Sequence, residues 1–136
     1  MKCLYPVICT NNVRATKEFY LSLFDFKVIF EAEWYVQLCA SENESLHIAF
    51  IEQSHPSVPV KYQNKPQGIV LTFEFTDVDK LYHRARQLGI PVVYEICDED
   101  WGQRHFMTVD PNGLLLDVVQ LIKPSEAFLK EHGLLK

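Results

Sequence analysis

Apolar and polar positions along the first half of the chain predict one helix and several strands. Residues 4–10 have the pattern of a short strand, and Asn11 and Asn12 then supply a turn and a helix cap. Most apolar side chains of residues 13–24 fall within one half of a helical wheel, which predicts an amphipathic helix. They are Val13, Ala15, Phe19, Tyr20, Leu23 and Phe24. Further strands are predicted over residues 26–30, 34–38 and 46–51. These elements form a first module over residues 4–52.

The same order of elements restarts after a polar linker. This linker, residues 53–68, carries three prolines and has little apolar periodicity. Residues 69–76 alternate between apolar and polar side chains, as a half-buried strand does. Asp77 is placed to cap a following helix, and Gly89 is placed to close it. The later segments are strands over residues 91–97, 103–109 and 114–121, an acidic connection at 98–100 and an Asp-Pro-Asn-Gly turn at 110–113.

The repeated order of elements predicts the fold class. We expect an α+β protein in which two βαβββ modules, residues 4–52 and 69–121, form a paired half-barrel cup. All 136 residues are expected to form a single domain, since this length suits one domain with a sizeable core. The tail, residues 122–136, is predicted to contain a short helix.

Composition and charge restrict the class of partner. The hydrophobic fraction of 48% and the charged fraction of 23% are those of a globular protein. We expect a cytoplasmic protein without a membrane partner, because no apolar run approaches about 20 residues and the first residues lack the core of a signal peptide. The net charge of -5, with no basic stripe, argues against nucleic acid. The four scattered cysteines are expected to be reduced and to act as small hydrophobic residues, with one nucleophilic cysteine as the alternative.

Each module contains its own set of short motifs. In the first module they are Phe19-Tyr20 and Leu23-Phe24-Asp25-Phe26. In the second they are Phe75-Thr76-Asp77-Val78-Asp79, Leu88-Gly89-Ile90-Pro91, Trp101-Gly102-Gln103-Arg104 and, most specific, Val109-Asp110-Pro111-Asn112-Gly113 followed by an acid at Asp117. From about residue 4 to 120, this pattern resembles the vicinal-oxygen-chelate superfamily of glyoxalases, bleomycin-resistance proteins and extradiol dioxygenases. The resemblance implies the glyoxalase/bleomycin resistance fold and favours the bleomycin-resistance-like branch.

The resemblance also implies four cup-facing positions, which hold a divalent metal in the enzymes of the superfamily. Counted from the helices, they fall at Tyr5, His47, Val70 and Asp117. Val70 has no donor atom, and the phenol of Tyr5 is protonated at neutral pH, so at most two ligands remain. We therefore expect no metal cofactor, and His47 then lines the cup or lies at the surface. The alternative is a divalent metal whose ligand set is completed by Glu74 or His105.

Alternation along the strands predicts the lining of the cup. The lining residues are Tyr5, Val7 and Cys9; His47, Ala49 and Ile51; Val70, Thr72 and Glu74; and Leu115, Asp117 and Val119. Such a mixture of apolar and polar groups is typical of a small-molecule pocket. Trp34 and Trp101 lie at corresponding turns, where they either stack on a flat ligand at the rim or pack in the core. Acidic residues near both turns favour a cationic or aromatic ligand.

Two carboxylates are the candidate catalytic residues. Glu74 and Asp117 could act as a general base or as a cation-binding pair. Alternatively, Glu74 points into solvent, and Asp117 forms an ion pair with Arg104 or Lys123. His105 is expected to be exposed on its strand.

Three functions are compatible with these patterns. The first, which we favour, is a metal-independent protein that binds and sequesters a small molecule, similar to the bleomycin-resistance branch. The resemblance then implies a homodimer with pockets between the subunits. The second is a metal-dependent lyase, isomerase or dioxygenase, and the third is a regulatory or interaction module. Whether the chain is an enzyme is left open, because one fold hosts both binding proteins and enzymes.

Overall fold

The computed structural model describes residues 1–134 and divides the chain into two compact units. The first unit comprises Met1–Ile69 together with Asp110–Leu114, and the second comprises Val70–Val109 and Leu115–Lys136. Strands and helices follow the predicted order, so an α+β class with two βαβββ modules is confirmed. Residues 135 and 136, which end the predicted tail, lie outside the described residues.

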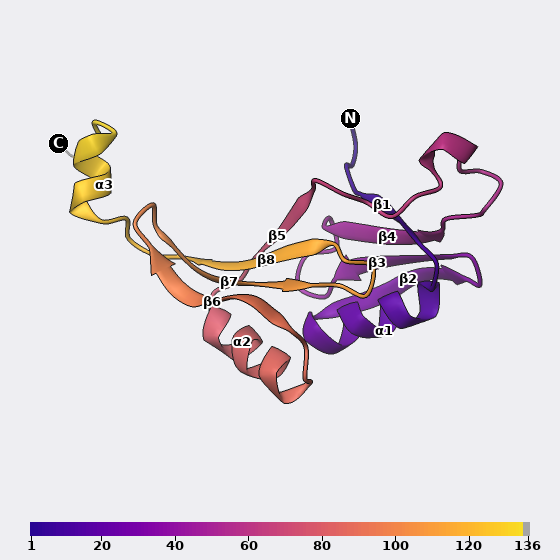
Figure 1. The fold of residues 1–136 in the computed structure, drawn as a ribbon, viewed down its shortest axis with the longest axis horizontal. Helices are drawn as coiled ribbons and strands as arrows, with labels where there is room; N and C mark the ends of the chain where they lie inside the picture. Colours follow the sequence, from indigo (N-terminus) through magenta and orange to yellow (C-terminus); the bar gives the residue numbers. More distant parts are fainter. Residues whose placement is uncertain (135–136) are drawn as a thin grey trace. The chain divides into compact units, whose positions relative to one another are not determined.

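The first module is a four-stranded sheet with one helix (Figure 1). Its elements are β1 (Val7–Thr10), α1 (Val13–Leu23), β2 (Phe26–Ala32), β3 (Tyr35–Ala40) and β4 (His47–Glu52). The strand order is β1-β4-β3-β2, in which β1 and β4 are parallel and the other neighbours are antiparallel. β1 begins later than predicted, so Tyr5 lies outside it. The linker contains a short 3-10 helix, η1 (Val60–Tyr62), which the sequence patterns did not predict.

Helix α1 buries an apolar face, as its periodicity predicts. The side chain of Asn12 accepts a hydrogen bond from the Ala15 N–H at 2.9 Å, which satisfies a donor of the first helical turn. Tyr20 and Leu23 are fully buried, and the Tyr20 ring lies 4.7 Å from the Phe50 ring of β4. Burying an apolar side chain of this size contributes about 1.5–3 kcal/mol, so these contacts hold the helix to its sheet.

The Asp-Pro-Asn-Gly turn is tied into the first unit by buried hydrogen bonds. The Tyr20 hydroxyl donates to Asp110 at 2.9 Å. Asp110 also accepts from the backbone N–H groups of Asn112 at 2.8 Å and Leu114 at 3.0 Å. The Thr10 hydroxyl donates to the Asn112 side chain at 2.6 Å. Because buried polar groups are costly unless they are paired, this network fixes the turn, and the motif has a structural role.

The second module repeats the plan of the first (Figure 1). Its elements are β5 (Val70–Glu74), α2 (Val78–Gln87), β6 (Val92–Glu99), β7 (Gln103–Val109) and β8 (Leu115–Leu121), followed by α3 (Glu126–Glu131) in the tail. The strand order is β5-β8-β7-β6, with β5 and β8 parallel. Asp77 caps α2 through the Lys80 N–H, and Gly89 after the helix has a φ of +68°, which glycine adopts readily.

Several boundaries in the second module differ from those predicted. β6 continues through Glu99, so two of the acidic residues expected in a connection belong to a strand. Their side chains therefore alternate between the faces of the sheet instead of pointing into solvent together. The tail contains a short helix, as predicted. Among residues 1–134, no helix is long and apolar enough to cross a membrane.

Candidate functional site

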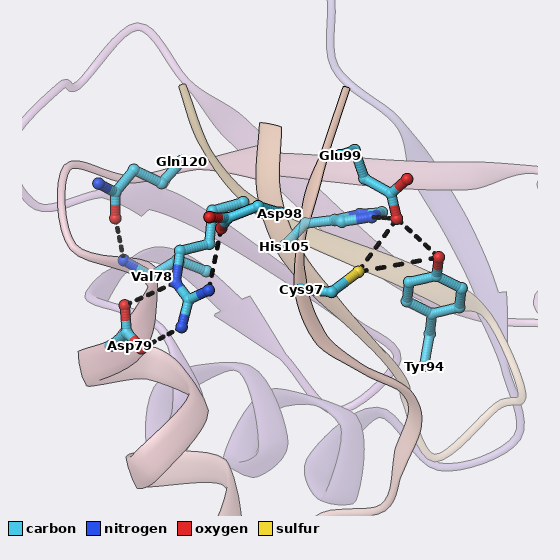
Figure 2. A network of polar contacts seen from close by, with 9 residues as sticks. Val78, Asp79, Tyr94, Cys97, Asp98, Glu99, His105 and Gln120 are labelled. Atoms are coloured by element: carbon cyan, nitrogen blue, oxygen red, sulfur yellow. Dashed lines mark hydrogen bonds and ion pairs between the residues drawn. The ribbon is translucent and has the colours of Figure 1, made fainter. Parts of the chain in front are cut away.

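One face of the second sheet gathers a group of chemically active side chains. Cys97 on β6 and His105 on β7 are cross-strand partners. Glu99 follows Cys97 by two residues and therefore lies on the same face. Asp117, on the neighbouring strand β8, contacts His105. Together with Tyr94, these residues are called the His105 cluster below. Figure 2 shows its members Tyr94, Cys97, Glu99 and His105.

Tyr94 joins this face because β6 is irregular. Tyr94 pairs with Met107 and Cys97 pairs with His105, so three steps along β6 match two steps along β7. An extra residue of this kind is a β-bulge, which shifts the alternation of side chains by one position. Tyr94 and Cys97 consequently face the same side although they are three positions apart in the sequence.

The imidazole of His105 bridges two carboxylates. Its Nδ1 lies 2.7 Å from an Asp117 oxygen and its Nε2 lies 3.2 Å from a Glu99 oxygen, while only 3% of the residue is exposed. Burial lowers the pKa of His105, but the hydrogen bonds with Asp117 and Glu99 outweigh burial and raise the pKa above its ordinary value. At a given pH His105 is therefore protonated to a larger extent than a free histidine. The prediction that His105 is exposed is wrong, because neighbouring strands and aromatic rings enclose it.

Glu99 accepts hydrogen bonds from several donors. The Tyr94 hydroxyl donates to it at 2.7 Å and the Cys97 thiol at 3.1 Å (Figure 2). These two bonds, followed by the bond from His105, lower the pKa of the Glu99 carboxyl. The hydrogen bond to Glu99 is also the largest reason that the pKa of Cys97 is raised. At neutral pH the arrangement is an ionised carboxylate beside a protonated thiol.

Two aromatic rings stand beside the imidazole. The Tyr94 ring lies 5.2 Å from the His105 ring at an interplanar angle of 47°, and the Trp101 ring lies 6.2 Å away at 72°. Both aromatic residues are partly exposed, Tyr94 at 43% and Trp101 at 48%. Gly102, with a φ of +100°, makes the tight turn that carries Trp101, and a Cβ there would lie 2.8 Å from the Ile122 carbonyl oxygen.

Arg104 binds two other carboxylates. It donates two hydrogen bonds to Asp79, at 3.0 and 2.9 Å, and one to Asp98 at 2.9 Å (Figure 2). The predicted alternative in which Asp117 pairs with Arg104 is therefore wrong. Asp117 instead forms a close hydrogen bond with His105. Arg104 and His105 are consecutive strand residues, so their side chains point to opposite faces of the sheet.

His47, in the first unit, is held by neutral partners. Its Nδ1 lies 2.8 Å from the Gln37 amide nitrogen, and its Nε2 lies 2.7 Å from the Glu44 carbonyl oxygen. The Gln37 amide donates to Nδ1, and Nε2–H donates to the carbonyl, so neither nitrogen keeps a free lone pair. Tyr35 donates to Gln37 at 2.8 Å, and the Tyr5 ring lies 5.8 Å from that of His47. This arrangement orients His47 without leaving it available to a metal.

The other predicted site residues lie outside the His105 cluster. Trp34 is in the first unit and stacks on His55, with ring centroids 4.0 Å apart. Along β5, Val70, Thr72 and Glu74 are all exposed, and Thr72 pairs with Asp117 in the sheet register. Of the predicted set, the second unit thus brings Asp117 and Trp101 together around His105.

The four positions implied for a metal do not fit a metal ion. Val70 has no donor atom, both nitrogens of His47 are engaged, and Asp117 binds His105. The prediction that the chain uses no metal cofactor stays a prediction.

Sequence reasoning did not bring Tyr94, Cys97 and Glu99 together as a site. The signal for the latter two is the spacing Cys97-x-Glu99 before a turn and His105 after it. A hairpin that pairs Glu99 with Gln103 necessarily places Cys97 opposite His105. The bulge that re-orients Tyr94 has no comparable signal in the sequence.

Comparisons with known proteins agree with this fold. Residues 2–118 match the family model described as Glyoxalase/Bleomycin resistance protein/Dioxygenase superfamily. No match was found among curated proteins. A solved structure described as a conserved domain protein is 27% identical, with a TM-score of 0.73 over 89% of this chain and 99% of that chain.

Two further solved structures share the fold at lower identity. The lactoylglutathione lyase from Agrobacterium tumefaciens is 17% identical, with a TM-score of 0.70 over 86% of this chain and 91% of that chain. A bleomycin resistance determinant encoded on the transposon TN5 is 20% identical, with a TM-score of 0.65 over 89% of this chain and 98% of that chain. These likenesses confirm the predicted glyoxalase/bleomycin resistance fold. The chain belongs to the Glyoxalase/Bleomycin resistance protein/Dioxygenase superfamily.

Proposed function

We propose that this chain binds and sequesters a small molecule without a metal at the four family positions. The binding face is the His105 cluster with Trp101. One observation carries the proposal: two partly exposed aromatic rings flank a buried imidazole that is hydrogen-bonded to two carboxylates. Exposed aromatic surface beside a few convergent polar groups is what small-molecule sites use for affinity and orientation.

The chemistry of the face favours a flat, cationic ligand. Glu99 and Asp117 supply two carboxylates against one imidazole, so the face is acidic whether or not His105 is protonated. Tyr94 and Trp101 offer ring faces or edges on which an aromatic cation can stack, and cation–π attraction adds to the carboxylate charge. The net charge of -5 also attracts cations toward the protein.

Metal independence is supported by the residues at the four family positions. Val70 offers no donor, and His47 has both ring nitrogens in hydrogen bonds. The likeness to a bleomycin resistance determinant supports a protective role of the same general kind. A metal-dependent lyase, isomerase or dioxygenase is the alternative, and it requires turnover that a chelator abolishes.

The proposal includes a homodimer in the cytoplasm. β2 is an edge strand of its sheet, and its residues Val28, Ile29 and Phe30 are 38%, 46% and 53% exposed. An apolar edge strand is a surface on which a second chain can pair. All four cysteines are free, as expected in a reducing compartment. Light scattering at micromolar concentration should give the mass of two chains, and a monomer would remove this part of the proposal.

Ligand binding is tested by titration with N-methylquinolinium, a flat cation, in the presence of EDTA. We expect saturable binding, with neutral quinoline at pH 8 binding more weakly because it lacks the charge. Trp101→Ala should weaken binding of the cation by about tenfold, the value of one cation–π contact. Trp34→Ala is the matched control, because its ring stacks on His55 in the first unit, and it should leave affinity within about twofold. Binding that both variants leave unchanged, or no binding at all, would contradict the proposal.

A further inference from the structure

We propose that Cys97, Glu99 and His105 form a site for a divalent ion of the zinc class, with Asp117 holding the imidazole in place. The first three residues are not at the four positions implied by the family resemblance. The inference goes beyond the proposed function, which needs no metal, and it rests on the geometry of one hairpin and one adjacent strand.

The three donor atoms already converge. The Cys97 sulfur, a Glu99 oxygen and a ring nitrogen of His105 all lie within 4.8 Å of one another. The Glu99 oxygen is 3.1 Å from the sulfur and 3.2 Å from His105 Nε2. Tetrahedral zinc with bonds of about 2.0–2.3 Å separates its ligand atoms by about 3.3–3.6 Å. The two distances from the Glu99 oxygen therefore need to change by only a few tenths of an ångström to accommodate an ion.

The backbone fixes this convergence. Cys97 and His105 are direct cross-strand partners, and Glu99 lies two residues beyond Cys97 on the same face. None of the three is exposed: His105 is buried, and the other two are half-buried. Side chains on two hydrogen-bonded strands need little further ordering to bind an ion, unlike ligands on loops.

Asp117 gives the imidazole the orientation that a metal requires. Its carboxylate lies 2.7 Å from Nδ1, so it holds the proton on that nitrogen and turns Nε2 toward Glu99 and Cys97. A carboxylate that orients a histidine in this way is the usual outer partner of a metal-bound imidazole. Asp117 is thus a positioning residue for this site, not one of its three ligands.

The donor set selects the class of ion. One thiolate, one imidazole and one carboxylate suit borderline ions such as Zn²⁺ and Co²⁺, whereas Mg²⁺ and Ca²⁺ prefer oxygen ligands. On coordination, the Cys97 thiol releases its proton to solvent. Three protein ligands leave one tetrahedral place open to water or to a ligand atom.

Cobalt titration tests the site, because a thiolate bound to Co²⁺ gives a charge-transfer absorption. The full chain, stripped with EDTA and then freed of it, should develop this absorption with a 1:1 endpoint, and Zn²⁺ should remove it. Cys97→Ser should abolish the absorption while circular dichroism stays unchanged. Cys3→Ser is the matched control, since Cys3 is exposed and outside the cluster, and it should behave like the wild type.

A second variant separates positioning from ligation. Asp117→Asn should keep the absorption but weaken Co²⁺ binding by about 10–100-fold, as loss of an outer partner does. If the wild type itself gives no charge-transfer absorption with Co²⁺, the proposal is overturned whatever the variants do. An absorption that survives Cys97→Ser would overturn it too. Because Co²⁺ is titrated without organic ligand and N-methylquinolinium is titrated with EDTA, failure of one proposal is distinguishable from failure of the other.

Discussion

The two modules share one plan but differ in the residues on corresponding strand positions. Val7 and Thr72 both stand six residues before the first residue of their helix. Val7 pairs with Ala49, whereas Thr72 pairs with Asp117. The first-module counterpart of Asp117 is therefore Ala49 and not the predicted His47, which lies two residues away.

The same comparison extends across the sheets. His105 pairs with Val119, and its counterpart Tyr35 pairs with Ile51. Cys97 pairs with His105, and its counterpart Ala32 pairs with Tyr35. The positions that hold an imidazole, a carboxylate and a thiol in the second module thus hold a phenol and two alanines in the first. The duplicated fold carries its chemically active cluster in one module, while the first module binds the Asp-Pro-Asn-Gly turn through Tyr20 and Asp110.

The largest expected effect separates the structural network from the binding face. Asp110→Ala removes the acceptor of the Tyr20 hydroxyl and of two backbone N–H groups, all buried. It should lower the free energy of unfolding by about 3 kcal/mol. Urea unfolding measures this change, and the exposed residue Asp25 provides a control, for which Asp25→Ala should stay within about 0.5 kcal/mol. Equal effects of the two substitutions would show that the network is not what holds the turn.

His105 should give the second module a distinctive pH dependence. Its folded pKa is raised, so its stabilising contribution is complete below the unfolded value of about 6.5 and is lost as pH rises through the folded value. The pKa of Glu99 is lowered, so its stabilising contribution is complete above the ordinary pKa range of carboxyl groups. That contribution is therefore constant over the pH range in which His105 titrates. His105→Gln should therefore cost more at pH 6 than at pH 9, with a loss of about 1–3 kcal/mol at pH 6. Denaturant unfolding of the wild type and of His105→Gln between pH 6 and pH 9 measures this loss. A difference in the free energy of unfolding that does not vary with pH would contradict the account.

The reactivity of Cys97 should depend on Glu99. The hydrogen bond to Glu99 is the largest cause of the raised pKa of Cys97, so Glu99→Gln should lower that pKa. A larger thiolate fraction should then speed alkylation of Cys97 by iodoacetamide severalfold at pH 8. Mass spectrometry of the Cys97 peptide measures the rate, and the exposed Cys3 provides an internal control. An unchanged rate at Cys97 would mean that Glu99 does not hold the thiol.

The smallest effect is expected at His47. Its partners are the Gln37 amide and the Glu44 carbonyl, and the bond to Glu44 is solvent-exposed. His47→Ala should cost about 0.5–1 kcal/mol in stability and leave both Co²⁺ and N-methylquinolinium affinities unchanged. The same unfolding and titration assays check this, and a tenfold loss of either affinity would place a binding role in the first module.

Much of the fold could be predicted because local patterns determine it. Alternation along residues 69–76, the cap at Asp77 and the turn at Asp110–Gly113 each have a physical cause that acts within a few residues. The cluster depends instead on pairing between strands. A bulge re-orients Tyr94, and the sheet register decides whether Ala49 or His47 corresponds to Asp117. His105 is covered by one ring from a neighbouring strand and one from a turn, and periodicity along its own strand does not reveal either contact.

The central claim is that the second module carries the ligand-binding face. The chain has two tryptophans, so a two-dimensional NMR spectrum contains two indole N–H signals, which the single variants Trp34→Ala and Trp101→Ala assign. On addition of N-methylquinolinium with EDTA present, we predict a saturable shift of the Trp101 signal, while the Trp34 signal stays in place. A shift confined to Trp34, or no shift in either signal, would contradict the account.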